Sequence, residues 1–233
     1  MFQSIFERYE NKYLISRDQA DTLVPILSAR MTPDRYASYS IASIYYDTPD
    51  YGLIRRSLEK PVYREKLRLR CYGSAGTDTT VFLELKKKYK KRVYKRRIGL
   101  PYALAQDFPK SGWESAAGNL GAAQIRGEIL QFLRLYQVRA AVLIRYDRSA
   151  FTGDGGLRLT FDTGIRFRTG GLVLDGDPAG VSLLPPEKVL MEIKTPDTMP
   201  LWLCRLLSEQ NIFPASFSKY GTCYAGFIKE RVT

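Results

Sequence analysis

Two segments of this sequence each place a glutamate and a lysine two positions apart within an apolar run. The first, VFLELKK, contains Glu84 and Lys86, and the second, VLMEIKT, contains Glu192 and Lys194. Side chains alternate between the two faces of a β-strand, so residues two apart share a face. A carboxylate can bind a divalent cation, and an ammonium group can bind the phosphate that this cation bridges. The repeated pair therefore predicts metal-assisted phosphate chemistry on one face of a sheet.

The same alternation recurs in four further segments with strand-like patterns. Their charged faces carry, in chain order, Arg8, Glu10 and Lys12; Lys66, Arg68 and Arg70; Tyr146 and Arg148; and Arg158, Thr160 and Asp162. The opposite faces are apolar, as at Leu67 and Leu69. An antiparallel sheet with one dry and one solvated face would alternate in the same way. The concentration of Arg, Lys and Glu on six strands favours a binding surface instead.

A sheet of this kind can close into a barrel with its charges outside or inside. Charges on the outside would leave the amphipathic helices no apolar surface to pack on, so we expect the charges to line a tunnel. Many cations in one lumen are costly unless a dense anion fills it, and phosphate oxygens suit both Arg and Lys. Glutamates in the lumen then indicate a divalent ion that bridges phosphates. An outer-membrane barrel would also alternate, but its apolar face would have no use for capped helices.

The predicted elements support this arrangement. Strands are predicted over residues 7–15, 39–47, 63–73, 80–90, 92–101, 140–151, 156–169 and 187–195. Helices are predicted over 16–31, 48–58, 198–210 and 218–230, with a central helix that Asn119 caps and that runs to Tyr136. Ser16 and Gln19 form a capping box for the first helix. Short matches, such as KLRLR with GLRLT, predict two related halves that each contribute three strands. The predicted fold class is α+β, an antiparallel β-barrel tunnel of about eight strands with helices packed on the outside, in one domain over 1–233.

The composition restricts the chemistry. Lysine and arginine number 36 against 24 acidic residues, and this net charge of +12 favours polyanionic partners. The sequence contains no histidine, which excludes imidazole bases and His-ligated zinc or iron and leaves Mn²⁺ or Mg²⁺ as the expected metal. Three separated cysteines fit a reducing compartment. No apolar run reaches the roughly 18 residues of a spanning helix, so we expect a soluble, cytoplasmic protein.

Eight motifs follow one another in the order ERYENKYLI, YYDTPD, LRLRCYG, FLELKKK, YDRSAF, LRLTFDT, LMEIKT and FSKY. In this combination the chain resembles the VTC domain from residue 7 to about 224. This is the polyphosphate polymerase domain of the vacuolar transporter chaperone family, within the triphosphate tunnel metalloenzyme superfamily. The resemblance implies an antiparallel β-tunnel that binds triphosphate, or ATP by its phosphates, with Mn²⁺ or Mg²⁺. Polymerase members transfer the γ-phosphate of ATP onto a growing polyphosphate chain.

The resemblance also assigns roles by motif. Phosphate ligands are expected at Lys12, Arg68, Arg70, Lys86, Lys95, Tyr146, Arg148 and Arg158, and the charged face adds Lys194. Glu192 matches the metal ligand of the family, and Lys219 in FSKY matches a lysine that is essential for activity. Glu84 and Glu10 are either further metal ligands or salt-bridge partners of neighbouring lysines, and we favour the salt bridges.

The resemblance departs from polymerase members at Ser216, where they carry a second lysine three residues before the lysine of FSKY. Three functions therefore stay open: a polymerase that uses ATP, a hydrolase of tripolyphosphate or another triphosphate, and a non-catalytic polyphosphate- or nucleic-acid-binding module. The run KKKYKKRVYKRR at 86–97 raises the last possibility. We interpret it as strands that send alternate residues into the tunnel, and expect no specific nucleic acid as partner. The oligomeric state and any membrane partner stay open.

Two aspartates on or next to predicted strands have local alternatives. Asp47 in YYDTPD is expected to cap the helix that follows it, because a carboxylate there accepts hydrogen bonds from the first helical N–H groups. Asp162 in LRLTFDT is expected either to assist the metal or to orient Arg158.

Overall fold

The structure, a computed structural model, describes residues 5–6, 9–90, 92–110, 113 and 120–232. The expected cap at Asn119 lies outside these residues. The strands are β1 (Ile5–Phe6), β2 (Tyr9–Ser16), β3 (Thr32–Asp47), β4 (Tyr63–Tyr72), β5 (Thr80–Tyr89), β6 (Arg92–Pro101), β7 (Arg139–Thr152), β8 (Arg158–Arg168), β9 (Val181–Ser182) and β10 (Lys188–Thr195). The helices are α1 (Arg17–Ser28), α2 (Gly52–Leu58), α3 (Tyr102–Ala105), α4 (Leu120–Tyr136), α5 (Leu201–Glu209), α6 (Lys219–Cys223), a π-helix (Tyr224–Ile228) and α7 (Lys229–Val232).

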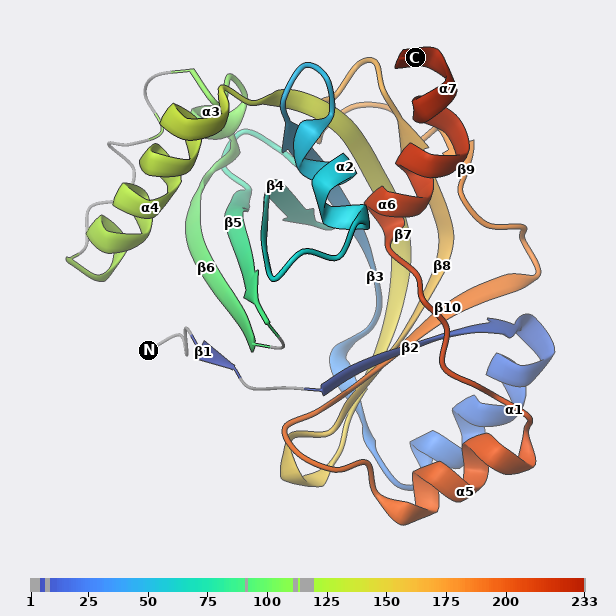
Figure 1. Ribbon diagram of the computed structural model, residues 1–233. Helices are drawn as coiled ribbons and strands as arrows, with labels where there is room; N and C mark the ends of the chain where they lie inside the picture. Colours follow the sequence, from blue (N-terminus) through green and yellow to red (C-terminus); the bar gives the residue numbers. More distant parts are fainter. Residues whose placement is uncertain (1–4, 7–8, 91, 111–112, 114–119, 233) are drawn as a thin grey trace.

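The strands form one antiparallel sheet in the order β1-β6-β5-β4-β3-β7-β8-β10-β2, with β9 paired to β8 (Figure 1). The sheet is not closed, because β2 and the β1–β6 pair are its two edges. It nevertheless curls around an interior. Lys86 Nζ on β5 lies 3.8 Å from Glu10 Oε2 on β2, although these strands are far apart in the sheet order. The predicted fold class, an antiparallel barrel-like sheet with packed helices, is confirmed.

The eight long strands are the predicted ones, and β1 and β9 are short additions. The largest difference is β3, which begins at Thr32 rather than near residue 39. Thr32 and Pro33 pair with the end of β7, across an irregularity in the register. Local sequence patterns predict that a strand ends at a proline, but pairing with β7 extends β3 through Pro33.

The first helix shows how local sequence sets an element boundary. The Oγ of Ser16 accepts a hydrogen bond from the backbone N–H of Gln19 at 3.1 Å, and the side chain of Gln19 accepts one from the Ser16 N–H at 2.9 Å. The predicted capping box is confirmed. It satisfies two N–H groups that have no partner within α1.

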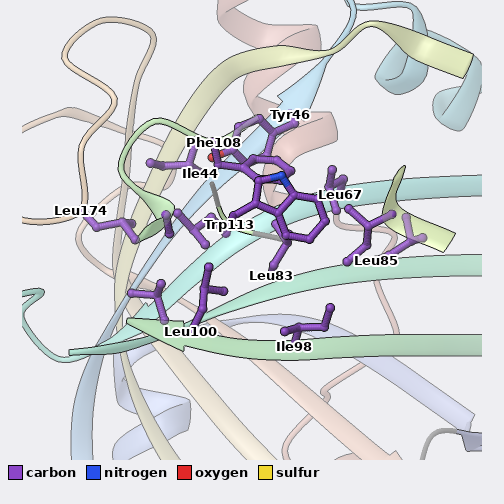
Figure 2. Packing of buried hydrophobic residues seen from close by; sticks show 14 of the residues in the cluster. Ile44, Tyr46, Leu67, Leu83, Leu85, Ile98, Leu100, Phe108, Trp113 and Leu174 are labelled. Carbon is purple, nitrogen blue, oxygen red and sulfur yellow. The ribbon is translucent and has the colours of Figure 1, made fainter. Parts of the chain in front are cut away.

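The outer face of β4 and β5 is apolar and is covered by helices. Leu67, Leu83 and Leu85 are fully buried against Phe132 of α4 and against Trp113. Figure 2 shows the indole of Trp113 lying over these strand residues. A second apolar cluster joins the outer face of β2, β8 and β10 to helices on the other side of the molecule: Ile15, Leu159, Val189, Met191 and Ile193 pack with Leu23 and Leu27 of α1 and with Leu203 and Leu206 of α5.

A third cluster lies on the inner face and was not predicted. The inner face of β3 and β7 is apolar at Ile41 and Ile144, and it packs against Ile54 of α2 and Tyr220 of α6. These two helices therefore lie on the concave side of the sheet (Figure 1), whereas α1, α3, α4 and α5 lie outside it. The inner face is consequently divided into an apolar part beneath helices and a charged part. None of the helices in the described part of the chain has the length and apolar character that a membrane crossing would need.

Candidate functional site

The charged part of the inner face encloses a cavity of about 960 Å³. Its walls come from strands β2 to β7 and β10, from the end of α2 and from the segment that leads into α6. Among the described residues, twelve lysines or arginines line it against four carboxylates. The cations are Lys12, Lys60, Arg64, Lys66, Arg68, Arg70, Lys86, Lys88, Arg92, Arg148, Lys194 and Lys219, and the acids are Glu10, Glu84, Glu192 and Asp197. Walls with this excess of positive charge attract and concentrate polyanions.

Glu84 on β5 is the centre of a closed cluster of ion pairs. Arg68 Nη2 and Nε lie 2.7 and 2.8 Å from its Oε2, and Lys95 Nζ lies 2.6 Å from its Oε1. Arg70 and Arg97 follow at 3.8 and 3.6 Å. Burial would raise the pKa of Glu84, but Arg68, Arg70 and Lys95 outweigh it and hold the pKa far below its ordinary value. This carboxylate is ionised and already surrounded by cations.

Glu192 on β10 has a much looser environment. Its nearest cation is Lys194, whose Nζ lies 3.3 Å from Oε2. Lys219 lies 3.7 Å from Oε1, and Lys12 and Arg148 each approach to 3.9 Å. Burial opposes ionisation, but these four cations hold the pKa of Glu192 well below its ordinary value. An ionised carboxylate with only distant partners among the described residues has room for a further ligand.

Asp162 on β8 orients two of the cations beside Glu192. Its two oxygens accept hydrogen bonds from Arg148 Nε and Nη2 at 2.6 and 2.7 Å, and its Oδ2 accepts another from Lys219. Burial would lower the pKa of Lys219, but Asp162 and Glu192 raise it above its ordinary value. Lys219 is therefore a fixed cation at neutral pH. Asp162 orients Arg148 and Lys219, and not Arg158 as one of its predicted roles required.

The position of Lys219 depends on a link between α6 and β3. The hydroxyl of Tyr220, the next residue, donates to Asp47 Oδ2 at 2.8 Å. The same carboxylate accepts from the backbone N–H groups of Leu53 and Ile54 at 2.8 and 3.0 Å, at the start of α2. The predicted role of Asp47 as a helix cap is confirmed. Its second bond, to Tyr220, was not predicted.

The structure brings most of the predicted site residues into the cavity. The lining contains Glu10, Lys12, Arg68, Arg70, Glu84, Lys86, Tyr146, Arg148, Glu192, Lys194 and Lys219. Lys95 and Arg158 are not part of it. Lys95 is held by Glu84, and Arg158 Nη2 donates to Asp34 Oδ2 at 2.8 Å and to the hydroxyl of Tyr39 at 3.3 Å.

Several lining residues were missed as site residues, and Tyr45 and Lys66 are two of them. The hydroxyl of Tyr45 accepts a hydrogen bond from Arg68 Nη1 at 3.3 Å. Burial raises the pKa of Tyr45, but Arg68 and Arg70 outweigh it and lower the pKa to about 8. Burial, reinforced by nearby lysines, also lowers the pKa of Lys66 to about 8. Alternation on β4 identified Lys66 as part of a charged face. Tyr45 gave no such signal, because its inner-face neighbours on β3 include the apolar Ile41.

The residues around Glu192 fit a metal ion that takes most of its ligands from water or phosphate and not from the protein. The described part of the chain contains no group of three or more acidic or cysteine side chains that could hold a metal ion. Thr160 lies directly opposite Glu192 in the register of β8 and β10, and its buried hydroxyl has no hydrogen-bond partner in the described residues. One carboxylate and one unsatisfied hydroxyl suit Mg²⁺ or Mn²⁺, which keep several waters or phosphate oxygens as ligands.

Comparisons with known proteins agree with this architecture. A family model described as the VTC domain matches residues 7–228. A candidate adenylate cyclase from Bacillus halodurans has a similar structure, with a TM-score of 0.57, 14% identity, and coverage of 97% of this chain and 100% of its own. A candidate adenylyl cyclase from Hippeastrum, HpAC1, has a TM-score of 0.51 and 17% identity, and covers 96% of each chain. At these identities the likeness shows the shared fold. No curated protein matches the sequence.

Proposed function

Because the chain belongs to the VTC domain family, we propose that it is a metal-dependent polyphosphate polymerase, which transfers the γ-phosphate of ATP onto a polyphosphate chain. The observation that carries this proposal is the cavity, which twelve cations of the described residues line, with Glu192 as the carboxylate that has room for a ligand. A chain of phosphates has the charge density that such a lining needs for compensation. The cavity is also large enough for an extended anion rather than a single ion.

Several of the cations that line the cavity are held in position by neighbouring carboxylates or hydroxyl groups. Arg68 is held by Glu84, which fixes its position, while Arg70 is held by Ser43 and Tyr146 through hydrogen bonds of 3.1 and 3.3 Å. Lys66 has no carboxylate partner within the described residues. Guanidinium groups fixed in this way present donors to phosphate oxygens without further loss of side-chain freedom. Arg68, Arg70, Lys66, Lys12, Lys86 and Lys194 are the proposed phosphate ligands, with Tyr146 as a hydroxyl donor.

Lys95 and Arg158 are proposed phosphate ligands on the family assignment alone. Neither lines the cavity, so each has to leave a carboxylate before it can bind phosphate. Lys95 would leave Glu84, and Arg158 would leave Asp34. Their contribution to binding is therefore expected to be smaller than that of Arg68 and Arg70.

Glu192 is the proposed metal ligand, and Thr160 would bind a water of the metal. A bound Mn²⁺ or Mg²⁺ would bridge phosphate oxygens and neutralise part of their charge. Glu84 differs from Glu192 because Arg68 and Lys95 contact it at 2.7 and 2.6 Å, so we assign it as a counter-ion of these cations. Glu10 has ion pairs as long as those of Glu192, with Lys12 at 3.5 Å and Lys86 at 3.8 Å, and we assign it as a counter-ion of these two lysines.

Lys219 and Arg148 are the cations closest to Glu192 on the side of α6. Phosphoryl transfer needs its reacting groups positioned and the charge on the transferring oxygens stabilised, and it needs no covalent protein intermediate. Because Asp162 keeps Lys219 protonated and immobile, this ammonium acts as an electrostatic stabiliser and not as a proton acceptor. Arg148, fixed by the same carboxylate, supplies a second donor there.

A triphosphate hydrolase is the second candidate. The cavity would bind its substrate in the same way, with water in place of polyphosphate as the acceptor. Two observations favour it: Ser216 stands in the cavity lining where polymerase members carry a second lysine, and HpAC1, which shares the fold, is described as having a dominant triphosphatase activity.

Incubation with ATP and Mn²⁺, with product separation by gel and by phosphate release, tests these alternatives. A polymerase produces ADP and long polyphosphate chains. A hydrolase releases inorganic phosphate without long chains. Omitting the metal, or replacing Mn²⁺ with Mg²⁺, shows the metal requirement. Binding of tripolyphosphate without turnover under all conditions would overturn both enzymatic assignments and leave a binding module.

A further inference from the structure

Tyr45 is the residue of β3 that lies directly opposite Arg68 of β4. Its side chain lines the cavity and is only 8% exposed. Its ring packs against that of Tyr220 on α6, with 5.0 Å between the two ring centroids. Because the hydroxyl of Tyr220 is bonded to Asp47, Tyr45 packs on a ring that is itself fixed. The Tyr45 hydroxyl is therefore held at one place on the cavity wall.

The hydrogen bonding of this hydroxyl is incomplete. A tyrosine hydroxyl can accept a hydrogen bond and can also donate one. Tyr102 does both, because its hydroxyl accepts from the backbone N–H of Leu174 at 3.0 Å and donates to Asp175 Oδ1 at 2.9 Å. Tyr45 accepts from Arg68 Nη1 at 3.3 Å, but it donates to no acceptor among the described residues. The proton of this buried hydroxyl is therefore available to a ligand in the cavity.

The charges around Tyr45 indicate which kind of ligand would accept this proton. Burial alone would raise its pKa, but Arg68, Arg70 and Lys219 outweigh burial and lower this pKa to about 8. The hydroxyl therefore keeps its proton at neutral pH, yet it is a stronger hydrogen-bond donor than an ordinary tyrosine. Cations around one donor favour an acceptor with negative charge. Ionised phosphate oxygens carry this charge, and they accept hydrogen bonds without donating any.

Tyr45 and Arg68 repeat an arrangement that occurs two positions further along β4. There Arg70 Nη2 donates to the hydroxyl of Tyr146 at 3.3 Å, and Tyr146 is one of the proposed phosphate ligands. In both pairs the arginine donates to the tyrosine oxygen. A phosphate oxygen that accepts from Arg68 Nη1 would lie within reach of the Tyr45 hydroxyl, because these two donor atoms are only 3.3 Å apart. One oxygen can therefore accept hydrogen bonds from both.

We propose that Tyr45 is a further phosphate ligand, whose hydroxyl donates a hydrogen bond to the phosphate oxygen that Arg68 also binds. This inference rests on the proposed function, because it requires a phosphate chain in the cavity. Neither the alternation of charges along the strands nor the family motifs assign this contact. In the proposed complex, Arg68 occupies the accepting side of the hydroxyl and the phosphate receives its proton. Tyr45 thus binds the ligand itself, in addition to contacting Arg68.

Tyr45→Phe tests the proposal, because it removes the hydroxyl and keeps the ring that packs against Tyr220. Binding of tripolyphosphate is measured by calorimetry on the full chain at neutral pH with Mn²⁺ present. The affinity should fall about tenfold, because a hydrogen bond to a charged group is lost. Tyr13→Phe is the matched control, since Tyr13 is a buried tyrosine of the outer-face cluster, and it should keep the wild-type affinity. An unchanged affinity in Tyr45→Phe would overturn the inference.

A second variant separates a phosphate ligand from a residue that only positions Arg68. Tyr45→p-aminophenylalanine replaces the hydroxyl with a neutral amino group, which donates hydrogen bonds but accepts them poorly. Because the proposed contact needs a donor, this variant should recover most of the affinity lost in Tyr45→Phe. An affinity as low as that of Tyr45→Phe, with native circular dichroism, would show that Tyr45 acts only by accepting from Arg68 and would refute the proposal. Failure of tripolyphosphate to bind the wild-type protein is a different result, which would overturn the proposed function instead.

Discussion

Glu84 and Glu192 occupy the same position in two nearly identical motifs, yet their surroundings differ. The residues opposite Glu84 on the neighbouring strands are Arg68 and Arg97, and its closest ion pairs are 2.6 and 2.7 Å long. The residues opposite Glu192 are Thr160 and Lys12, and its closest ion pair is 3.3 Å long. The cross-strand neighbours, and not the motif, decide whether the carboxylate is a counter-ion or a potential metal ligand.

This comparison explains why a cation-lined cavity can fold before it binds an anion. Glu84 compensates arginines that would otherwise repel one another within a buried cluster. Glu192 neutralises the cations around it only partly. These cations can therefore bind a further anion. On the proposed function, one carboxylate therefore serves stability and the other serves function.

Replacing Glu84 with Gln tests the stability half of the comparison and has the largest expected effect. Removing one partner of a buried ion pair leaves uncompensated charges, so the free energy of unfolding should fall by roughly 3–5 kcal/mol. Chemical denaturation measures it. Glu192→Gln is the control and should cost clearly less, because its ion pairs are long. Equal losses in the two variants would show that the two sites do not differ.

The pH dependence of stability follows from the same residue. The pKa of Glu84 in the folded protein lies below its ordinary value of 4.5. Its contribution to stability is therefore complete above pH 4.5 and is lost as the pH falls below that value toward the folded pKa. The difference in unfolding free energy between the wild type and Glu84→Gln should shrink over that window. A difference that does not change with pH would contradict the assignment.

Glu192→Gln tests the functional half. Without the metal ligand, turnover of ATP or tripolyphosphate should fall about 10²–10³-fold, similar to the loss of one strong electrostatic group in an active site. Steady-state rates at saturating Mn²⁺ provide the measurement, and an unchanged circular dichroism spectrum excludes misfolding. A variant with normal turnover would refute the metal role of Glu192.

Thr160→Val tests whether the hydroxyl opposite Glu192 contributes to the proposed metal site. The buried hydroxyl has no protein partner in the described residues, so its removal should not lower stability. If it binds a water of the metal, the Mn²⁺ concentration for half-maximal activity should rise about tenfold. A metal titration of activity, with thermal unfolding alongside, separates the two effects. An unchanged metal requirement would place Thr160 outside the metal site.

The prediction with the smallest expected effect concerns the pKa of Tyr45. Its pKa is lowered to about 8 by arginines that Glu84 partly neutralises. Glu84→Gln should lower the pKa further by a fraction of a pH unit, and bound tripolyphosphate should raise it. Ultraviolet absorbance of tyrosinate follows this titration, and Tyr45→Phe identifies its contribution. No change on phosphate binding would indicate that the anion does not reach Arg68.

Most of the architecture could be predicted from the sequence, because the patterns that indicate it lie within single strands and helices. Alternation along single strands predicted which face is charged, and the Ser16–Gln19 capping box predicted the start of α1. Glu192 and Lys219 were found from motifs that resemble a known family. Those residues lie together in the structure because neighbouring strands and α6 converge on the cavity.

The missed features depend on contacts between distant residues. Lys95 points toward Glu84, and Arg158 reaches Asp34 across 124 positions of the chain. Neither ion pair can be predicted from the alternation of side chains along a single strand. Helices α2 and α6 lie inside the sheet because part of its inner face is apolar, and Ile41 and Ile144 show this only once β3 and β7 are paired.

The bond between Tyr220 and Asp47 joins residues 173 positions apart, and it has a consequence for synthesis on the ribosome. The last long strand, β10, ends at Thr195, so the whole sheet leaves the ribosome before Lys219 does. A nascent chain at that stage has the basic groove but lacks the ammonium beside Glu192. On the proposed function, the site is therefore complete only after α6 has docked onto the sheet.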